Sequence, residues 1–148
     1  MQEINRYGII GCGMMGQEHL RNIALLPATA VVAIFEPEAK MRQAAQSLAP
    51  DAVFVESLDQ LLAREDLDCL VIVSPNHVHL EQLERIAHYP ARPVLVEKPL
   101  VTNAQDLARV EAFKTQYNAP VWVAMEYRYM PPIAALKDRF ESVTGGLK

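Results

Sequence analysis

Glycines near the N-terminus have the spacing of a turn that binds phosphate groups. They follow directly on the apolar run Tyr7-Gly8-Ile9-Ile10. Gly11 would permit a tight turn out of a strand, Gly13 would leave room for a pyrophosphate against the backbone, and Gly16 would let a helix pack closely on the strand. The phosphates would lie at the N-terminus of that helix, where unpaired N–H groups favour anions. The residues predicted to form this loop are Gly11, Cys12, Gly13, Met14, Met15 and Gly16.

A carboxylate stands at the distance from this loop where a dinucleotide-binding fold places its ribose contact. Glu36 lies 20 positions beyond Gly16, at the end of a second apolar run. Its carboxylate could accept hydrogen bonds from both hydroxyls of an adenosine ribose, and its charge would repel a 2′-phosphate. The glycine spacing alone is common by chance, but the preceding strand, the following helix and the acid are all present. Together these residues predict a site for NAD in preference to NADP.

A second set of polar residues follows the fourth expected strand. The run Ser74-Pro75-Asn76-His77-Val78-His79 lies where ligands bind in such folds, beyond the carboxyl end of a strand. His77 and His79 are two positions apart, so on a helix they would point in different directions and would not share a metal ion. We therefore expect no metal site. An alternative interpretation of this run is a turn with a helix cap, in which Asn76 satisfies exposed backbone N–H groups.

The run Glu97-Lys98-Pro99 occupies the corresponding place after the fifth expected strand. A lysine at a strand tip that faces a cleft can donate a hydrogen bond to a substrate oxygen. A lysine considered alone is more often a solvated surface charge. Pro99 would impose an extended or turn geometry that could aim Lys98, and the bond before a proline is the kind that adopts the cis form. Lys98 is therefore the candidate catalytic residue.

The elements that would position these residues are visible in the hydrophobic pattern. Short runs rich in Val and Ile alternate with longer segments of helical period, which predicts an α/β class fold, a doubly wound parallel sheet of the Rossmann type. Right-handed crossovers would give the strand order 3-2-1-4-5-6. The expected strands are 6–11, 30–35, 52–55, 69–73, 94–97 and 121–125. One helix face predicted to be core consists of Met41, Ala44, Ala45 and Leu48. The pairs with capping-box spacing are Ser57 with Gln60 and Thr102 with Gln105.

The composition changes after the last expected strand. Ile133, Leu136 and Phe140 mark one face of an amphipathic helix, and Gly145-Gly146 is typical of a turn before a further strand. We therefore expect a dinucleotide-binding domain at residues 1–125. Residues 126–148 would form a connecting helix that leads to a C-terminal substrate domain, and we expect that domain to be absent from this chain.

Composition restricts the classes of partner. The chain has 148 residues, of which 51% are hydrophobic, and a net charge of −4. Its lysines and arginines are scattered, so we expect no nucleic-acid partner. No apolar run approaches the roughly 20 residues that cross a bilayer, and the N-terminus lacks the features of a secretion signal, so we expect no membrane association. Cys12 and Cys69 are expected to be reduced thiols, and the expected location is the cytoplasm.

The motifs together resemble a known family. In order, they are Gly8 to Gly16 followed by His19, then Ser74 to His79, then Glu97 to Pro99. This combination is similar to the glucose-fructose oxidoreductase / inositol dehydrogenase / MocA family of nicotinamide-dependent oxidoreductases. The segment from Trp122 to Pro132 also resembles the passage from the nucleotide-binding domain of that family into its second domain.

The resemblance implies a role for each motif. The glycine loop would hold the pyrophosphate and Glu36 the adenosine ribose. Glu97 and Lys98 would line the reaction centre, with Lys98 orienting or protonating a substrate hydroxyl or carbonyl, and the Lys98–Pro99 bond would be cis. Family members carry a second domain that supplies the rest of the substrate pocket and usually the interface of a homo-oligomer. The residues implied on the nicotinamide side are Ser74, Pro75, Asn76 and His79.

The leading prediction is therefore an oxidoreductase that transfers a hydride between NAD and a hydroxyl-bearing carbon of a sugar, inositol or related polyol. This chain alone would be inactive. The alternatives are a non-catalytic NAD-binding regulator and an NAD-dependent glycosidase that oxidises its substrate transiently. A methyltransferase is the remaining glycine-loop alternative, but its loop usually follows an acidic residue in the first strand, where this chain has Arg6-Tyr7.

Overall fold

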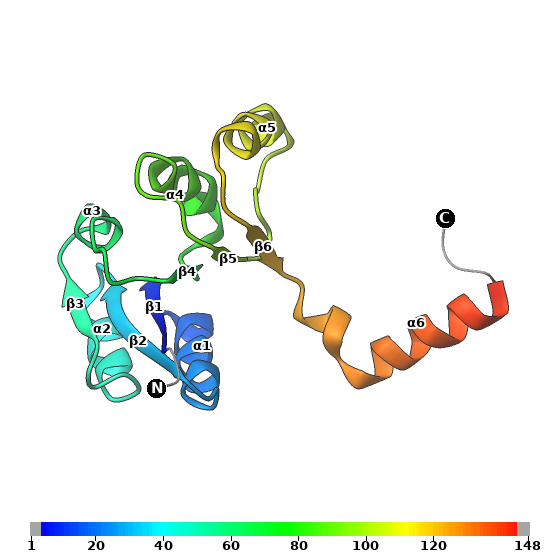
Figure 1. Cartoon of the computed structure of the whole chain (residues 1–148), viewed down its shortest axis with the longest axis horizontal. Coiled ribbons are helices and arrows are strands. Elements are labelled where there is room, and N and C mark those ends of the chain that lie inside the picture. The colour runs from blue at the N-terminus through cyan, green and yellow to red at the C-terminus, as the bar shows by residue number, and fades with distance from the viewer. Residues whose placement is uncertain (1–3, 145–148) are drawn as a thin grey trace.

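A parallel sheet forms the centre of the molecule in a computed structural model that describes residues 4–144 (Figure 1). Its order is β3-β2-β1-β4-β5-β6, and every neighbouring pair of strands is parallel. This confirms the predicted fold class and strand order, and the strand ends lie within about one residue of those expected from the sequence. The strands are β1 (Asn5–Ile10), β2 (Thr29–Phe35), β3 (Val53–Val55), β4 (Cys69–Ile72), β5 (Val94–Glu97) and β6 (Val121–Ala124).

Helices cover both faces of the sheet (Figure 1). The α-helices are α1 (Met14–Ala24), α2 (Ala39–Gln46), α3 (Leu58–Leu62), α4 (His79–Ile86), α5 (Leu107–Gln116) and α6 (Pro131–Thr144). Short 3₁₀ helices are η1 (Asn76–Val78), η2 (Ala104–Asp106) and η3 (Glu126–Tyr129). The first two helices, α1 and α2, pack on one face, and α3, α4 and α5 pack on the other.

Consecutive residues of the central strand supply the two cores. Ile9 packs with Leu20 and Ile23 of α1, whereas Ile10 belongs to the cluster on the opposite face with Leu61 of α3. Both isoleucines are fully buried. Because side chains alternate across a strand and both faces are covered, the strand must be apolar at successive positions. This explains the continuous apolar runs that predicted the sheet.

One of the two predicted capping boxes is present. The Ser57 hydroxyl accepts a hydrogen bond from the Gln60 backbone N–H at 3.2 Å at the start of α3. The prediction for Thr102 is wrong, because the side chain of Asn103 caps the following 3₁₀ helix by accepting from Gln105 N at 3.0 Å. Asn is as good a cap as Thr, and one residue of difference in the start of the helix decides between them.

The C-terminal segment differs from the rest of the molecule. Figure 1 shows α6 extending away from the sheet. Its apolar residues Ile133, Leu136 and Phe140 are about half exposed. The helix predicted here is present, but Gly145 and Gly146 lie outside the described residues. Within residues 4–144, no helix has the length and apolar character needed to cross a membrane.

Candidate functional site: a cleft at the carboxyl edge of the sheet

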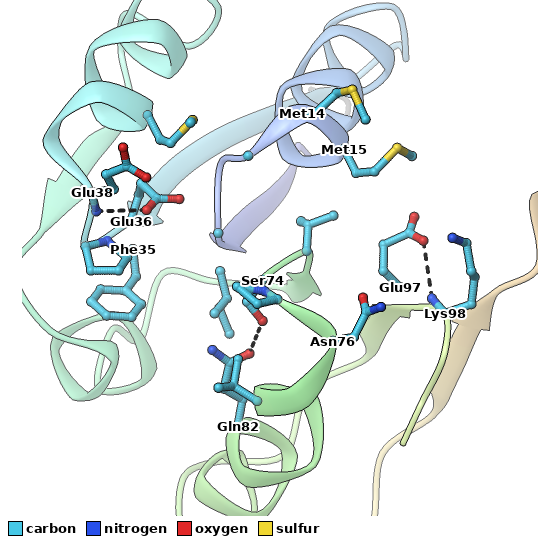
Figure 2. A pocket seen from close by; sticks show the side chains of 18 residues that line it. Met14, Met15, Phe35, Glu36, Glu38, Ser74, Asn76, Gln82, Glu97 and Lys98 are labelled. Atoms are coloured by element: carbon cyan, nitrogen blue, oxygen red, sulfur yellow. Dashed lines mark hydrogen bonds between the residues drawn. The ribbon is translucent and has the colours of Figure 1, made fainter. Parts of the chain in front are cut away.

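The carboxyl ends of β1, β2, β4 and β5 border a cleft of about 630 Å³. A volume of this size is in the range of small-molecule and cofactor sites. The cleft lies where the strand order reverses between β1 and β4, which is where open α/β sheets bind their ligands. Figure 2 shows that its walls come from the glycine loop, the β2–α2 turn, the turn after β4 and the end of β5. The motifs identified in the sequence therefore meet in one cleft.

The glycines of the loop differ in whether the surrounding protein leaves space for a side chain. Gly11 has a φ of +95°, and a Cβ there would lie 2.7 Å from Ser74 N. A Cβ on Gly16 would lie 2.5 Å from the carbonyl oxygen of Gly11. A Cβ on Gly13, in contrast, would meet no protein atom within 4 Å. The fold itself excludes side chains at Gly11 and Gly16. Gly13, in contrast, leaves space in the cleft at the N-terminus of α1, a position that favours anions.

The Glu36 carboxylate is fixed at the end of β2 by backbone donors. Its Oε2 accepts from Cys12 N at 2.6 Å and its Oε1 accepts from Glu38 N at 2.9 Å. The residue is 7% exposed and lines the cleft. A carboxylate has about four lone-pair sites, so both oxygens retain acceptor capacity for ribose hydroxyls. The side chain is thus buried, oriented and able to bind a diol.

Cys12 contributes its backbone and not its thiol to this arrangement. Its side chain is fully buried and does not line the cleft. Burial, together with the nearby charge of Glu36, raises the pKa of the Cys12 thiol to about 12. The thiol is therefore protonated at neutral pH, and a protonated, buried thiol is a poor nucleophile. In the part of the chain that the structure describes, no group of three or more His, Cys, Asp or Glu residues could hold a metal ion.

The turn after β4 presents some of its predicted residues to the cleft and buries another. Ser74, Pro75 and Asn76 line the cleft, and the Ser74 hydroxyl hydrogen-bonds to Gln82 Oε1 at 2.6 Å. The interpretation of Asn76 as a cap is wrong, since no side chain caps η1 or α4. His79 is fully buried and does not line the cleft. Its Nδ1 and Nε2 each lie 2.9 Å from a backbone carbonyl oxygen, those of Pro99 and Ser74.

Glu97 and Lys98 form the wall opposite Glu36 (Figure 2). Glu97 is 7% exposed, its Oε1 lies 2.9 Å from His19 Nε2, and its Oε2 accepts from Lys98 N at 3.2 Å. Lys98 itself is exposed, and its ammonium group has no hydrogen-bond partner among residues 4–144. The predicted cis bond between Lys98 and Pro99 is present. A charged donor is therefore held at the rim of the cleft with its tip open to a ligand.

The sequence analysis missed several contributors to this cleft. Glu38 and Gln82 line it, although no motif predicted them. Met41 was predicted to be core, but it lines the cleft while Ala45 on the same helix is buried. His19 was noted only as part of a motif, and its contact with Glu97 joins residues 78 positions apart in sequence. The position of Glu38 two residues after Glu36, at the start of α2, was the available signal for that residue.

The geometry defines a dinucleotide-binding Rossmann domain. The chain belongs to the oxidoreductase family with an NAD-binding Rossmann fold, the glucose-fructose oxidoreductase / inositol dehydrogenase / MocA family, which it matches over residues 5–125. This confirms the resemblance noted in the sequence and the predicted cofactor, NAD.

Known proteins with similar sequences and structures agree with this assignment. The chain is 36% identical over 143 residues to an inositol 2-dehydrogenase of Gluconacetobacter diazotrophicus, covering 94% of this chain and 42% of that protein. It superposes with a TM-score of 0.86 on myo-inositol dehydrogenase from Lactobacillus casei in complex with NAD(H) and myo-inositol, at 25% identity, covering 97% of this chain and 43% of that one.

A similar structure that contains a different second ligand has the same fold. The chain superposes with a TM-score of 0.82 on the WlbA dehydrogenase from Bordetella pertussis in complex with NADH and UDP-GlcNAcA, at 27% identity, covering 95% of this chain and 42% of that one. The chain thus spans less than half the length of the curated relatives it matches, for example 42% of the inositol 2-dehydrogenase of Agrobacterium fabrum. The region of this chain that matches these relatives includes the NAD-binding Rossmann domain at residues 5–125.

Proposed function

We propose that the full-length protein is an NAD-dependent dehydrogenase that transfers a hydride between NAD and a hydroxyl-bearing carbon of an inositol or a related polyol. The observation that carries this proposal is the exposed Lys98, which stands in the same cleft as the glycine loop and has no partner for its ammonium among the described residues. The 36% identity to an inositol 2-dehydrogenase supports a polyol as the substrate class.

The residues of the cleft fit the parts of the cofactor. The space at Gly13 and the N-terminus of α1 would take the diphosphate, and Glu36 would bind the adenosine ribose. Ser74, Pro75 and Asn76 would lie along the nicotinamide, for which Asn76 offers an amide without a partner among residues 4–144. When bound, NAD supplies the hydride acceptor.

Lys98 would perform the proton part of the reaction. An ammonium at the rim can donate a hydrogen bond to the substrate oxygen, which orients the carbon that carries the hydride. In the direction of reduction, the ammonium gives a proton to the oxygen as the carbonyl becomes a hydroxyl. In the direction of oxidation, the neutral amine form of Lys98 takes the hydroxyl proton as the carbonyl forms, and the resulting ammonium releases that proton to solvent. The second proton-transfer group and most of the substrate walls would come from a further part of the full-length protein. This chain covers 42% of the inositol 2-dehydrogenase it matches, which leaves room for such a part.

The proposal extends to the organisation of the whole protein. We propose that residues 1–125 are the nucleotide-binding domain and that residues 126–148 lead into a substrate domain. The apolar residues of α6 support this, because about half of the surface of each remains exposed. We also propose a homo-oligomer in the cytoplasm, and the free thiols of Cys12 and Cys69 are consistent with a reducing compartment.

Substrate oxidation by the full-length protein tests the proposal. The protein is incubated with NAD and a panel of inositols, aldoses and glycosides, and NADH absorbance and glycoside hydrolysis are followed together. We expect NADH to accumulate with an inositol or a related polyol and not without it. Tight NAD binding with no product would identify the regulator instead. Glycoside hydrolysis with no net NADH would identify the glycosidase and overturn the dehydrogenase proposal.

A further inference from the structure

Histidines from two different helices contact the residues on either side of Lys98. His19 of α1 has its Nε2 2.9 Å from Glu97 Oε1, and His79 of α4 has its Nδ1 2.9 Å from the carbonyl oxygen of Pro99. The other oxygen of Glu97 accepts from the backbone N–H of Lys98 at 3.2 Å. The residues before and after Lys98 are therefore both held by contacts with other helices, whereas the Lys98 side chain has no hydrogen bond among the described residues.

The side chains that make these contacts are largely shielded from solvent. His79 is fully buried, and its Nε2 also contacts the carbonyl oxygen of Ser74 at 2.9 Å. The side chains of His19 and Glu97 are 18% and 9% exposed. Hydrogen bonds that are shielded from water are costly to break, because the groups left behind have no replacement partner. Such contacts can hold a turn in one conformation, whereas solvated ones would allow several.

Neither histidine lies in the cleft itself. The lining of the cleft includes Glu97 and Lys98 but neither His19 nor His79. In this cleft, both side chains are therefore placed to contact the turn and not the ligand space. Their effect must pass through the turn that carries Lys98.

We propose that His19 and His79 are positioning residues that clamp the Glu97-Lys98-Pro99 turn from two sides and so aim the Lys98 ammonium into the cleft. This inference rests on the proposed function, because it concerns the lysine that the function uses. His79 also joins this turn to Ser74, so the nicotinamide side and the lysine side of the cleft share one anchor.

Amide substitutions separate the individual contacts. The amide nitrogen of Gln approximates the position of a histidine Nε2, and that of Asn approximates Nδ1. His19→Gln therefore keeps a donor for Glu97, whereas His19→Ala removes it. At His79, Asn keeps the contact with Pro99 and Gln keeps the contact with Ser74. His88→Gln is the matched control, because His88 is exposed and lies outside the cleft.

Two measurements on the full-length protein decide the matter. In steady-state kinetics, His19→Ala should lower kcat by about 10²-fold, as a misplaced catalytic group does. The Kd for NAD should stay within about threefold, because a group that acts only through Lys98 does not contribute to cofactor affinity. His19→Gln should restore most of the turnover, and His79→Asn should retain more of it than His79→Gln. The His88→Gln control should match the unsubstituted protein.

Amide hydrogen exchange gives a second readout that does not depend on turnover. The Lys98 N–H should exchange faster in His19→Ala than in the unsubstituted protein and should regain its protection in His19→Gln. Unchanged exchange and unchanged kcat in His19→Ala would overturn the clamp. If kcat fell only in parallel with the melting temperature or the NAD affinity, the role of His19 would be general stability and not the positioning of Lys98. Failure of the proposed function is distinct, since the unsubstituted protein would then produce no NADH.

Discussion

The two ends of the cleft are built in different ways. At the adenosine end, Glu36 is buried and each oxygen of its carboxylate accepts a backbone N–H from its own β-α-β unit. At the reaction end, Lys98 is exposed, and only its backbone is held. In the proposed function, the first end would bind a part of the cofactor that does not vary, and one local unit would suffice to form it. The second end would contact the substrate in the proposed function, and the Lys98 ammonium has no partner within the described part of the chain.

Replacement of Lys98 should produce the largest effect and should be confined to the reaction end. In the full-length protein, Lys98→Met removes the donor to the substrate oxygen and should lower turnover by about 10²- to 10⁴-fold. NAD affinity should change little, because the adenosine end is intact. Turnover and isothermal titration with NAD measure the two effects separately.

A solvated lysine elsewhere provides the control for this experiment. Lys114→Met changes an exposed side chain on α5. The Lys114 Nζ lies 3.8 Å from Glu111 Oε2. Turnover should remain at the level of the unsubstituted protein. If Lys98→Met also kept turnover within a few-fold on its preferred polyol, Lys98 would be a surface charge, and the proposed division between the two ends of the cleft would be wrong.

The difference between the two ends also explains what the sequence could predict. Gly11, Gly13 and Glu36 belong to one β-α-β unit, whose geometry fixes their spacing, so a sequence pattern suffices to find them. The sheet order follows in the same way from apolar runs and right-handed crossovers.

The remaining features depend on packing between distant segments. The contact of His19 with Glu97 and that of His79 with Pro99 require the final arrangement of α1, α4 and β5. Met41 has the spacing of a core residue, yet the direction of α2 turns it to the cleft. Periodicity shows which residues share a helix face but not what that face meets.

The glycines between the two ends give the next largest effect. Gly16→Ala forces a Cβ to 2.5 Å from the Gly11 carbonyl oxygen, whereas Gly13→Ala meets no protein atom within 4 Å. Gly16→Ala should therefore lower the free energy of unfolding by about 1–3 kcal/mol. Gly13→Ala should leave it within about 0.5 kcal/mol. Gly13→Ala should weaken NAD binding, because its Cβ would occupy the space proposed for the diphosphate.

Denaturant unfolding and NAD titration on the same samples test this pair. A Gly13→Ala protein that binds NAD as before would contradict the placement of the diphosphate at that position. Equal destabilisation by the two substitutions would contradict the distinction between a glycine required by the fold and one required by the ligand.

At the adenosine end, the charge of Glu36 should set the choice between NAD and NADP. Glu36→Gln removes the repulsion of a 2′-phosphate and should reduce the preference for NAD by about tenfold or more, since a single charge in a partly buried site is worth over 1 kcal/mol. Glu38 is exposed on the same rim, so solvent screens its charge and Glu38→Gln should have a smaller effect. Titrations with both cofactors give the ratio of affinities.

Glu18→Gln, on the exposed surface of α1 and outside the cleft, is the control for these two substitutions. Its ratio of affinities should equal that of the unsubstituted chain. An unchanged ratio in Glu36→Gln would remove this residue from cofactor selection, and a larger change in Glu38→Gln would transfer the role to its neighbour.

The smallest effect should come from the outer helix layer, away from both ends of the cleft. Hydrogen bonds from Arg85 and then Tyr89 lower the pKa of Asp59 to about 2 and join α3 to α4. A depressed carboxyl pKa means that the folded state favours the charged form. The charged Asp59 therefore contributes to stability at pH values above its ordinary pKa of 3.8. This contribution is lost as the pH falls towards the folded-state pKa of about 2.

Asp59→Asn should lower the melting temperature slightly at neutral pH and have less effect at about pH 2, where the unsubstituted chain has lost the same interaction. The effect is small because the group is exposed and solvent weakens such pairs. Asp51→Asn replaces an exposed aspartate in the turn before β3 and is the control, and its melting temperature at neutral pH should match that of the unsubstituted chain. NAD affinity at neutral pH should be unchanged in both variants. A difference between Asp59→Asn and the unsubstituted chain that stayed constant from neutral pH to about 2 would show that charge is not the source of the contribution.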